Sequence, residues 1–380
     1  MERTYLVNGA VYIDRAFQKK TVLMADGKLE LLPPEAPTGD GQVVDAAGRR
    51  IVPGFVDIHT HGGVGVDVNG ASAEDLERVS RFMAGHGTTA WLASVLTDTQ
   101  EQTEWCIRQM LDHRRGPTEG AELLGVHLEG PFLSPAYKGA MPERLLRTND
   151  LELVRHYQTL AEGNIRYITI SPELPGAVEM IPALRELGLA VAIGHSGATY
   201  DQAMAAVSAG AVAATHMGNA MRLLHQHEPA IFGAALESDV YCEIICDGRH
   251  LHPGTVRILL KAKGLDRVAA ITDSIMAAGL PDGKYHLGVN EVVVEDGDAK
   301  LASDGTRAGS TLTQDTALRN LLAYTGRPLE EILPVLTENP AKLIGVYDRK
   351  GPIEDGKDAD LVVLDEQNQV ADVFLQGIRL

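Results

Sequence analysis

The stretch Pro53-Gly54-Phe55-Val56-Asp57-Ile58-His59-Thr60-His61 is an apolar run that ends in two histidines. Because successive side chains of a strand alternate between its faces, His59 and His61 project from the same face. Two neutral imidazoles that project together from a strand end make half of a transition-metal site. A lone His-x-His pair occurs by chance in many chains, so its meaning depends on what the other strand ends carry.

Apolar, β-branched runs of strand length recur along the chain, and helix-like segments separate most of them. The runs are Ile51–His61, Thr88–Leu96, Leu123–Glu129, Tyr167–Ile170, Leu189–His195, Ala211–His216, Tyr241–Cys246 and Val268–Asp273. Capping boxes at Ser72–Asp75 and Thr199–Gln202 predict where two of the helices begin. Near-continuously apolar strands that alternate with helices indicate a parallel sheet covered by helices. Eight such units predict an α/β fold, a (β/α)8 barrel of the TIM type, rather than an open doubly wound sheet.

Both ends of the chain have a different pattern. Short strand-like runs are found at Thr4–Tyr12, Thr21–Met24, Leu29–Leu32, Ala359–Leu364 and Val370–Leu375. Neither end buries much apolar surface alone, so we expect the two to pair. The predicted organisation is a barrel of residues 53–343 beside a small β-sandwich domain built from residues 1–52 and 344–380.

Composition limits the partners and the compartment. The chain has 380 residues, of which 44% are hydrophobic and 23% charged, and a net charge of −18. This charge disfavours nucleic acid and anionic membranes as partners, and any anionic substrate needs local donors. No apolar stretch reaches the ~20 residues of a membrane helix, and the N-terminus lacks the apolar region of a signal peptide. Cys106, Cys242 and Cys246, an odd number without Cys-x-x-Cys spacing, fit reduced thiols in a cytoplasmic protein.

Five of the predicted strands end in residues of metal-ligand type, and in a parallel barrel all these ends open on one mouth. The residues are His59, His61, Glu129, His195, His216 and Asp273. For any one of them, a hydrogen-bonded polar group at a strand end is the simpler interpretation. Six such residues at one mouth predict a metal centre.

The residue types indicate the chemistry. Glu129, His195 and His216 would hold a divalent ion and leave a fourth position for water. The ion would lower the pKa of that water towards ~7 and so supply hydroxide at neutral pH. Asp273 is placed to accept the proton of the water as general base and to pass it to a leaving amine.

His59 and His61 could hold a second ion, with Glu129 as the bridging carboxylate. We therefore expect one or two ions per subunit. Imidazole and carboxylate ligands suit zinc, the first choice, and also iron, manganese or cobalt.

Further motifs follow the same order along nearly the whole chain. They are Pro-Gly-Phe-Val-Asp-Ile-His-Thr-His at 53–61, His-Leu-Glu-Gly-Pro-Phe at 127–132, Gly-His-Ser at 194–196, Thr-His-Met-Gly-Asn-Ala-Met at 215–221, Asp-Gly-Arg-His at 247–250, Thr-Asp at 272–273, Gly-Ser-Thr-Leu-Thr at 309–313 and Thr-Glu-Asn-Pro-Ala at 337–341. In these motifs the chain resembles the N-acetylglucosamine-6-phosphate deacetylase family of the amidohydrolase superfamily.

The resemblance implies a homodimeric, metal-dependent amidohydrolase that converts N-acetylglucosamine 6-phosphate to glucosamine 6-phosphate and acetate. It implies that Glu129, His195 and His216 are the primary ligands and that Asp273 is the catalytic base. His59 and His61 match the members that use two ions. The positions that match substrate contacts of the family are Asn219, Ala220, His250, Ala308 and Gly309.

Two positions depart from the family pattern. His227 stands where relatives have an arginine that binds the substrate phosphate, and histidine is mostly neutral at pH 7. Met141, next to Ala140, stands where relatives have a His or Gln that donates to the acetyl carbonyl. A thioether cannot donate, and losing one such donor costs roughly 3–4 kcal/mol in the barrier. Arg222, Arg249 and Arg307 are candidates for a replacement cation.

Three functions remain open from the sequence. The first is the deacetylation that the resemblance implies. The second is the same mechanism on a different N-acyl amino sugar, phosphorylated or not, that His227 and Met141 recognise. The third is a non-catalytic barrel that acts as an interaction or sensor protein, because one fold hosts many functions.

Overall fold

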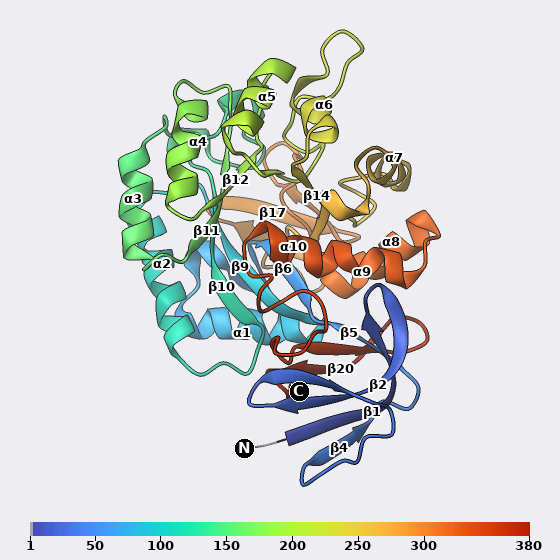
Figure 1. Ribbon diagram of the computed structural model, residues 1–380. Coiled ribbons are helices and arrows are strands. Elements are labelled where there is room, and N and C mark those ends of the chain that lie inside the picture. Colours follow the sequence, from blue (N-terminus) through green and yellow to red (C-terminus); the bar gives the residue numbers. More distant parts are fainter. Residues whose placement is uncertain (1–2) are drawn as a thin grey trace.

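The computed structural model describes residues 3–380, which form a barrel and a smaller β domain (Figure 1). Neighbouring strands of the barrel sheet are parallel and follow one another in chain order. The strands are β6 (Phe55–Thr60), β9 (Thr88–Leu96), β10 (Glu122–Glu129), β11 (Ile165–Ile170), β12 (Ala190–Ile193), β13 (Ala213–Ala214), β14 (Tyr241–Ile245) and β15 (Val268–Ile271). The predicted (β/α)8 barrel is confirmed.

Hydrogen bonds between β15 and β6 close the barrel. The Asp273 N–H donates to the His59 carbonyl at 2.9 Å, and the His61 N–H donates to the Ser274 carbonyl at 2.7 Å. Deeper in the seam, the Thr272 hydroxyl donates to Asp57 at 2.6 Å. Asp57 is fully buried, and burial raises the pKa of its carboxyl to about 6. The seam therefore sets the distance between the first and last strand ends.

Helices surround the barrel sheet on its outer face (Figure 1). They are α1 (Ala73–Gly85), α2 (Gln100–Arg115), α3 (Leu151–Leu160), α4 (Ala177–Glu186), α5 (Tyr200–Ala209), α6 (Ala230–Glu237), α7 (Pro253–Lys263), α8 (Gln314–Thr325), α9 (Leu329–Leu336) and α10 (Glu338–Leu343). Both predicted capping boxes are confirmed, at the starts of α1 and α5. Each satisfies N–H groups that the first helical turn leaves without partners.

The first predicted strand is in fact two strands. β5 (Arg50–Pro53) belongs to the terminal β domain, and β6 belongs to the barrel. Gly54 separates them, and a Cβ atom at this position would lie 2.0 Å from the Thr89 hydroxyl oxygen. The prediction of one continuous strand over Ile51–His61 was therefore wrong at Gly54, where the close approach of Thr89 requires glycine.

The second domain is one sheet from both ends of the chain. It contains β1 (Arg3–Ile13), β2 (Ala16–Ala25), β3 (Lys28–Leu32), β4 (Gln42–Asp45), β5, β19 (Leu361–Leu364), β20 (Val370–Leu375) and β21 (Ile378–Arg379). β5 and β19 pair antiparallel and so join the N-terminal strands to the C-terminal ones. The sheet encloses its own core, which includes Leu6, Ile51 and Phe374. The predicted small β domain from both termini is confirmed.

A three-stranded excursion between β15 and α8 was not predicted. It consists of β16 (Gly283–Leu287), β17 (Asn290–Glu295) and β18 (Asp298–Leu301). Its apolar side chains, Leu287 and Val292 among them, pack in one cluster with Met141 near the barrel mouth. A shorter hairpin, β7 (Gly62–Gly63) and β8 (Val66–Asp67), follows β6.

A buried lysine fastens the terminal domain to the barrel. The Lys350 side chain is 2% exposed, and its Nζ lies 2.7 Å from Glu122 at the start of β10. It also lies 3.0 Å from Asp358 and hydrogen-bonds Asp360, both just before β19. Burial alone would lower the pKa of Lys350, but the three carboxylates raise it above its ordinary value. The lysine is therefore charged and links the two sheets.

We expect Lys350→Met to reduce the free energy of unfolding by about 3–5 kcal/mol, because it leaves buried carboxylates without their cation. Urea denaturation at pH 7 measures the loss. Lys261→Met, at an exposed position on α7, is the matched control and should change stability by less than about 0.5 kcal/mol. Equal stability of the two variants would contradict the role of Lys350 at this junction.

Candidate active site

The structure brings all six predicted residues of metal-ligand type together at the mouth of the barrel. Each follows or ends a strand: His59 and His61 with β6, Glu129 with β10, His195 with β12, His216 with β13 and Asp273 with β15. All six are buried. Their clustering follows from the parallel topology, because the carboxyl ends of all barrel strands open on one face.

The Glu129 carboxylate lies at the centre of four imidazoles. Its Oε1 atom is 3.1 Å from Nε2 of both His195 and His216 and 3.3 Å from Nε2 of His59. Its Oε2 atom is 3.2 Å from Nε2 of His61. Contacts with the imidazoles outweigh burial and hold the pKa of Glu129 well below its usual range. Glu129 is therefore an anion that all four histidines share.

Strained backbone conformations orient three of these side chains. His195, His216 and Asp273 have φ values of 47°, 27° and 50°, in the left-handed region that non-glycine residues rarely adopt. Each turns the chain directly after its strand. Such conformations cost of order 1–3 kcal/mol each and concentrate at functional sites.

The other ring nitrogen of three histidines donates to an oxygen outside the cluster. The pairs are His59 Nδ1 to Glu243 Oε2 at 3.1 Å, His61 Nδ1 to the Ser94 carbonyl at 3.0 Å, and His195 Nδ1 to the Tyr137 carbonyl at 3.0 Å. Because Nδ1 donates, Nε2 carries the lone pair and faces Glu129.

These residues fit divalent metal ions. His59, His61 and Glu129 form one set whose ligand atoms all lie within 4.8 Å of one another, and Glu129, His195 and His216 form a second. Each set offers two nitrogens and one oxygen and leaves room for a fourth ligand, as in catalytic zinc sites. The sets share Glu129, as the bridging role predicted from the sequence requires.

Asp273 lies beside the cluster as an ionised acceptor. Its Oδ1 atom is 3.2 Å from Nε2 of His61 and 3.6 Å from Nε2 of His59. Burial would raise the pKa of Asp273, but its contacts with the His61 and His59 imidazoles lower it below the usual value. A carboxylate in this state accepts a proton from a water molecule at neutral pH.

A cavity of about 220 Å³ opens above the cluster. Most of the predicted substrate contacts line it: Ala140, Met141, Asn219, Ala220, His250 and Gly309. Ala308 does not line it, because its side chain packs into the apolar cluster around Met141. Of the three candidate arginines, Arg307 lines the cavity, whereas Arg222 and Arg249 do not.

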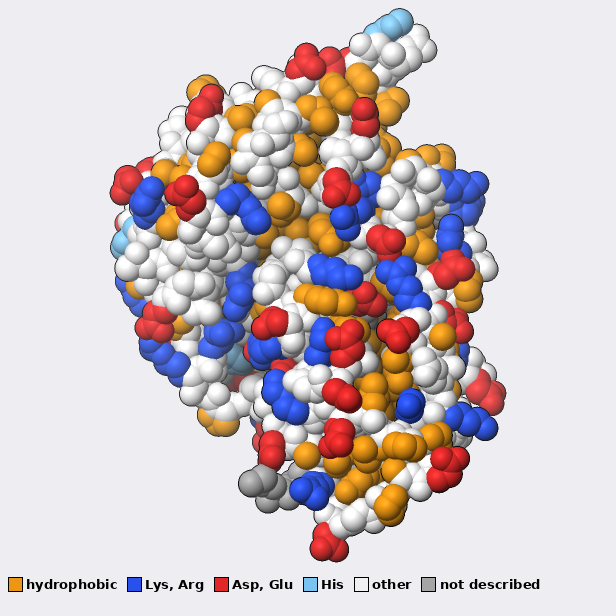
Figure 2. Space-filling view, in the orientation of Figure 1, with side chains coloured by type: hydrophobic (Ala, Val, Ile, Leu, Met, Phe, Trp, Pro, Cys, Tyr) orange, Lys and Arg blue, Asp and Glu red, His pale blue; other side chains and the backbone are white. Residues whose placement is uncertain are grey.

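His227 lies away from this cavity. It belongs to an exposed segment, residues 223–227, between the turn after β13 and α6. Figures 1 and 2 show this segment projecting beyond the body of the barrel. The structure therefore does not bring His227 together with the other predicted substrate contacts.

Sequence reasoning missed the residues that orient the ligands. Glu243 is a single acid in the apolar strand Tyr241–Ile245, and it is fully buried against His59. Its position in an otherwise apolar strand was the available signal. His127, in the same motif as Glu129, is buried between Ser94 and Thr169, at 2.9 Å from each hydroxyl, and belongs to neither ligand set.

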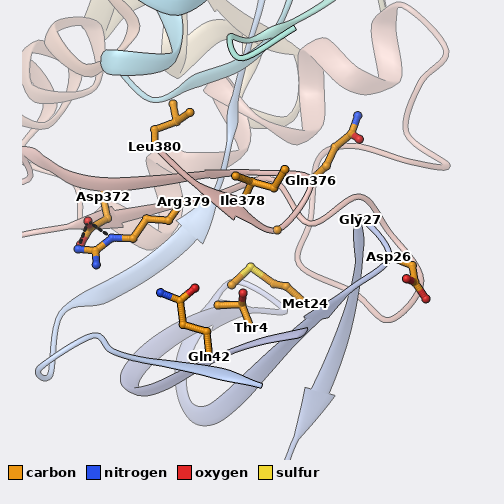
Figure 3. Close-up of a pocket in the computed structure, with 11 residues that line it drawn as sticks. Thr4, Met24, Asp26, Gly27, Gln42, Asp372, Gln376, Ile378, Arg379 and Leu380 are labelled. Atoms are coloured by element: carbon orange, nitrogen blue, oxygen red, sulfur yellow. Dashed lines mark hydrogen bonds and ion pairs between the residues drawn. The ribbon is translucent and has the colours of Figure 1, made fainter. Parts of the chain in front are cut away.

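Another cavity, of about 620 Å³, lies in the terminal β domain (Figure 3). Its lining carries two acids, Asp26 and Asp372, and Asp372 forms an ion pair with Arg379 at 2.5 Å. Although it is larger than the cavity at the barrel mouth, its lining contains no group of metal ligands or of acid and base. The chemistry of the molecule is therefore at the barrel mouth.

Known proteins share this architecture and these motifs. The model of the Amidohydrolase family matches residues 50–379. The N-acetylglucosamine-6-phosphate deacetylase of Bacillus subtilis (strain 168) is 37% identical over 358 residues, which is 93% of this chain and 90% of the relative. The chain belongs to the N-acetylglucosamine-6-phosphate deacetylase family of the amidohydrolases.

Two further relatives matter for this amidohydrolase. The N-acetylgalactosamine-6-phosphate deacetylase of Escherichia coli O157:H7 is 33% identical over 355 residues, 93% of each chain. A solved structure of a Mycobacterium smegmatis deacetylase, an aspartate-to-alanine mutant in complex with N-acetyl-D-glucosamine-6-phosphate, superposes with a TM-score of 0.92. It is 32% identical and covers 100% of this chain and 99% of its own.

Among residues 3–380, no helix combines the length and apolar character needed to cross a membrane.

We expect Asp273→Asn to reduce kcat by about 10²–10⁴-fold, the usual contribution of a general base, because an amide cannot accept the proton. Acetate release from N-acetylglucosamine 6-phosphate gives the rate, and elemental analysis gives the metal content. The metal content should match that of the parent protein. Asp112→Asn, at an exposed position on α2, is the control for a lost carboxylate. A kcat within threefold of the parent would exclude Asp273 as the base.

Proposed function

We propose that this protein hydrolyses the acetamide of N-acetylglucosamine 6-phosphate to glucosamine 6-phosphate and acetate. The observation that carries the proposal is the pair of ligand sets that share Glu129, with the ionised Asp273 beside them. The family adds the substrate, since relatives over most of the chain are N-acetylglucosamine-6-phosphate deacetylases. A non-catalytic role is not favoured, because the six residues that would hold the metal and act as base lie together at the barrel mouth.

A divalent ion held by Glu129, His195 and His216 would supply Lewis acidity, which would polarise the acetyl carbonyl and lower the pKa of a water molecule towards ~7. Asp273 accepts the proton of the attacking water while the water oxygen bonds to the carbonyl carbon. Asp273 then gives that proton to the nitrogen as the carbon–nitrogen bond breaks. The remaining proton of the acid passes to the amine, so the products leave as acetate and the protonated amine. The Asp273 Oδ1 atom lies 3.2 Å from Nε2 of His61, so the carboxylate is held beside both ligand sets.

The apolar part of the cavity fits the acetyl group. Leu96, Met141 and Leu287 line it together. The acetyl methyl group would be buried against them, which is favourable in proportion to its area. Met141 cannot donate to the carbonyl oxygen, so stabilisation of the negative charge on that oxygen rests on the metal centre.

Arg307 is the cation that we assign to the substrate phosphate. Its Nε and Nη2 atoms donate to Asp298 at 3.0 and 3.3 Å, which fixes the guanidinium plane and leaves Nη1 for a ligand. His250 lies on the same cavity and its Nδ1 is 2.7 Å from Asp247, so its Nε2 is available. Together with Asn219 and Ala220, which also line the cavity, these groups would hold the sugar phosphate.

The finer assignments are also proposals. The donor sets suit zinc first, and iron, manganese or cobalt next, with one or two ions per subunit. A homodimer is supported by Leu223 and Leu224, which are 58% and 54% exposed on the projecting segment. A cytoplasmic location is supported by three buried cysteines without a disulfide. The amino sugar is the proposed partner, with no role for nucleic acid or membrane.

We expect the metal-loaded protein to release acetate from N-acetylglucosamine 6-phosphate at least ~100-fold faster, in kcat/KM, than from N-acetylglucosamine, because a site built for a polar group discriminates strongly against its loss. N-acetylgalactosamine 6-phosphate is the third substrate to assay, since one relative carries that name. Faster turnover of this epimer would reassign the sugar. Equal rates with and without phosphate would favour another N-acyl amino sugar.

Arg307→Met should raise KM for the phosphorylated substrate by about 10–100-fold, because a hydrogen bond to a charged group contributes roughly 1.5–3 kcal/mol. Its kcat and its kcat/KM for the unphosphorylated sugar should stay within threefold of the parent values. Steady-state kinetics on both sugars measure this split, with Arg249→Met as the control. If His227→Ala raises KM and Arg307→Met does not, the phosphate is bound by the projecting segment of a second copy instead.

A further inference from the structure

Glu243 is a buried charge inside the barrel that the mechanism above does not use. It lies on β14 between apolar neighbours, and its side chain is fully buried below the metal ligands. Burying a carboxylate costs several kcal/mol unless a cation and hydrogen bonds compensate for it. Glu243 therefore needs a compensating positive charge.

The contacts of Glu243 connect it to both ligand sets. Its Oε2 atom lies 3.1 Å from His59 Nδ1 and accepts the backbone N–H of His216 at 3.1 Å. Its Oε1 atom has no hydrogen-bond partner among the described residues, and the buried Tyr167 hydroxyl has none either. The His59 imidazole is thus the side chain through which positive charge can reach Glu243.

His59 differs from the other oriented ligands in the charge of its acceptor. His61 and His195 donate to neutral backbone carbonyls, whereas His59 donates to a carboxylate. A carboxylate partner raises the basicity of an imidazole and strengthens its bond to a metal. The His59, His61 and Glu129 set therefore contains the histidine whose bond to a metal is strengthened by a carboxylate partner.

Charge balance points the same way. Glu129, Asp273 and Glu243 place three carboxylates within contact distance of the histidine cluster. With neutral imidazoles, one divalent ion leaves the three carboxylates with a net charge of −1 (−3 + 2). The negative charge of Glu243 therefore strengthens the attraction of a second cation.

We propose that Glu243 is a positioning residue that fixes the tautomer and direction of His59 and thereby sets the affinity of a second divalent ion at His59, His61 and Glu129. The proposal rests on the metal centre of the proposed function but not on its substrate. Glu243 acts through His59 and touches neither the substrate nor the reacting water.

Zinc binding by the full-length protein tests this assignment. Metal-free protein is titrated with zinc in competition with a chelator, and elemental analysis after equilibration at a fixed free zinc concentration gives the number of ions bound. The parent protein should bind two ions. Glu243→Gln, which keeps the shape and the hydrogen-bond acceptor but removes the charge, should bind one ion about 10–100-fold less tightly, and this should be the ion that His59→Ala loses. The other ion should keep its affinity within threefold.

Two controls separate positioning from general damage. Glu186→Gln makes the same substitution at an exposed position on α4 and should leave both zinc affinities unchanged. In a His59→Ala background, which should bind one ion, adding Glu243→Gln should cause no further change. If Glu243→Gln does not fold, as judged by circular dichroism, Glu243→Asp replaces it, because the shorter carboxylate cannot reach His59 in the same position.

The outcomes that overturn the proposal are distinct. Unchanged affinities in Glu243→Gln, an equal loss of both ions, or a further loss in the His59→Ala background would each exclude a role through His59. A parent protein that binds one ion would exclude a second site. A parent protein that binds no zinc but still releases acetate would overturn the metal centre and leave the substrate assignment to be judged on kinetics.

Discussion

The site depends on one buried carboxylate, Glu129, that lies within 3.1–3.3 Å of four imidazole nitrogens. Of these five side chains, only those of His59 and His61 come from the same strand. The others become neighbours because the strands form a closed sheet. Closure of the barrel by the hydrogen bonds between Thr272 and Asp57 brings the last strand beside the first. The metal centre is therefore a property of the closed sheet, and the energy that holds its anions and imidazoles together comes from the large apolar core around the strands.

Rigidity of the ligands comes from outside the cluster. Backbone carbonyls orient His61 and His195, a carboxylate orients His59, and left-handed backbone conformations aim His195, His216 and Asp273. Strain of this kind is stable only where the surrounding structure determines it fully. The fixed arrangement means that little reorganisation is needed when an ion binds, which is what a catalytic site requires.

The sequence predicted the parts of the molecule that repeat. Apolar strands and capped helices recur with regular spacing, so the barrel and the ligands at its strand ends could be located from the residues alone. Three features escaped prediction for identifiable reasons. The break at Gly54 depends on its contact with Thr89, a neighbour in space. The excursion β16–β18 alternates polar and apolar residues in short runs and does not resemble the buried barrel strands. The role of Glu243 depends on which face of β14 points inward.

Specificity and chemistry come from different parts of the chain. Strand ends supply all six residues that we propose as metal ligands and base, and these positions are constrained by the barrel. The unpredicted excursion supplies Leu287 to the cavity wall and Asp298 to hold Arg307, whose loop follows β18. In a chain of net charge −18, an anionic sugar phosphate is attracted only by such local cations. The cation that we propose for the phosphate lies on a loop and not on a barrel strand, so this contact can differ between relatives without a change in the residues of the barrel mouth.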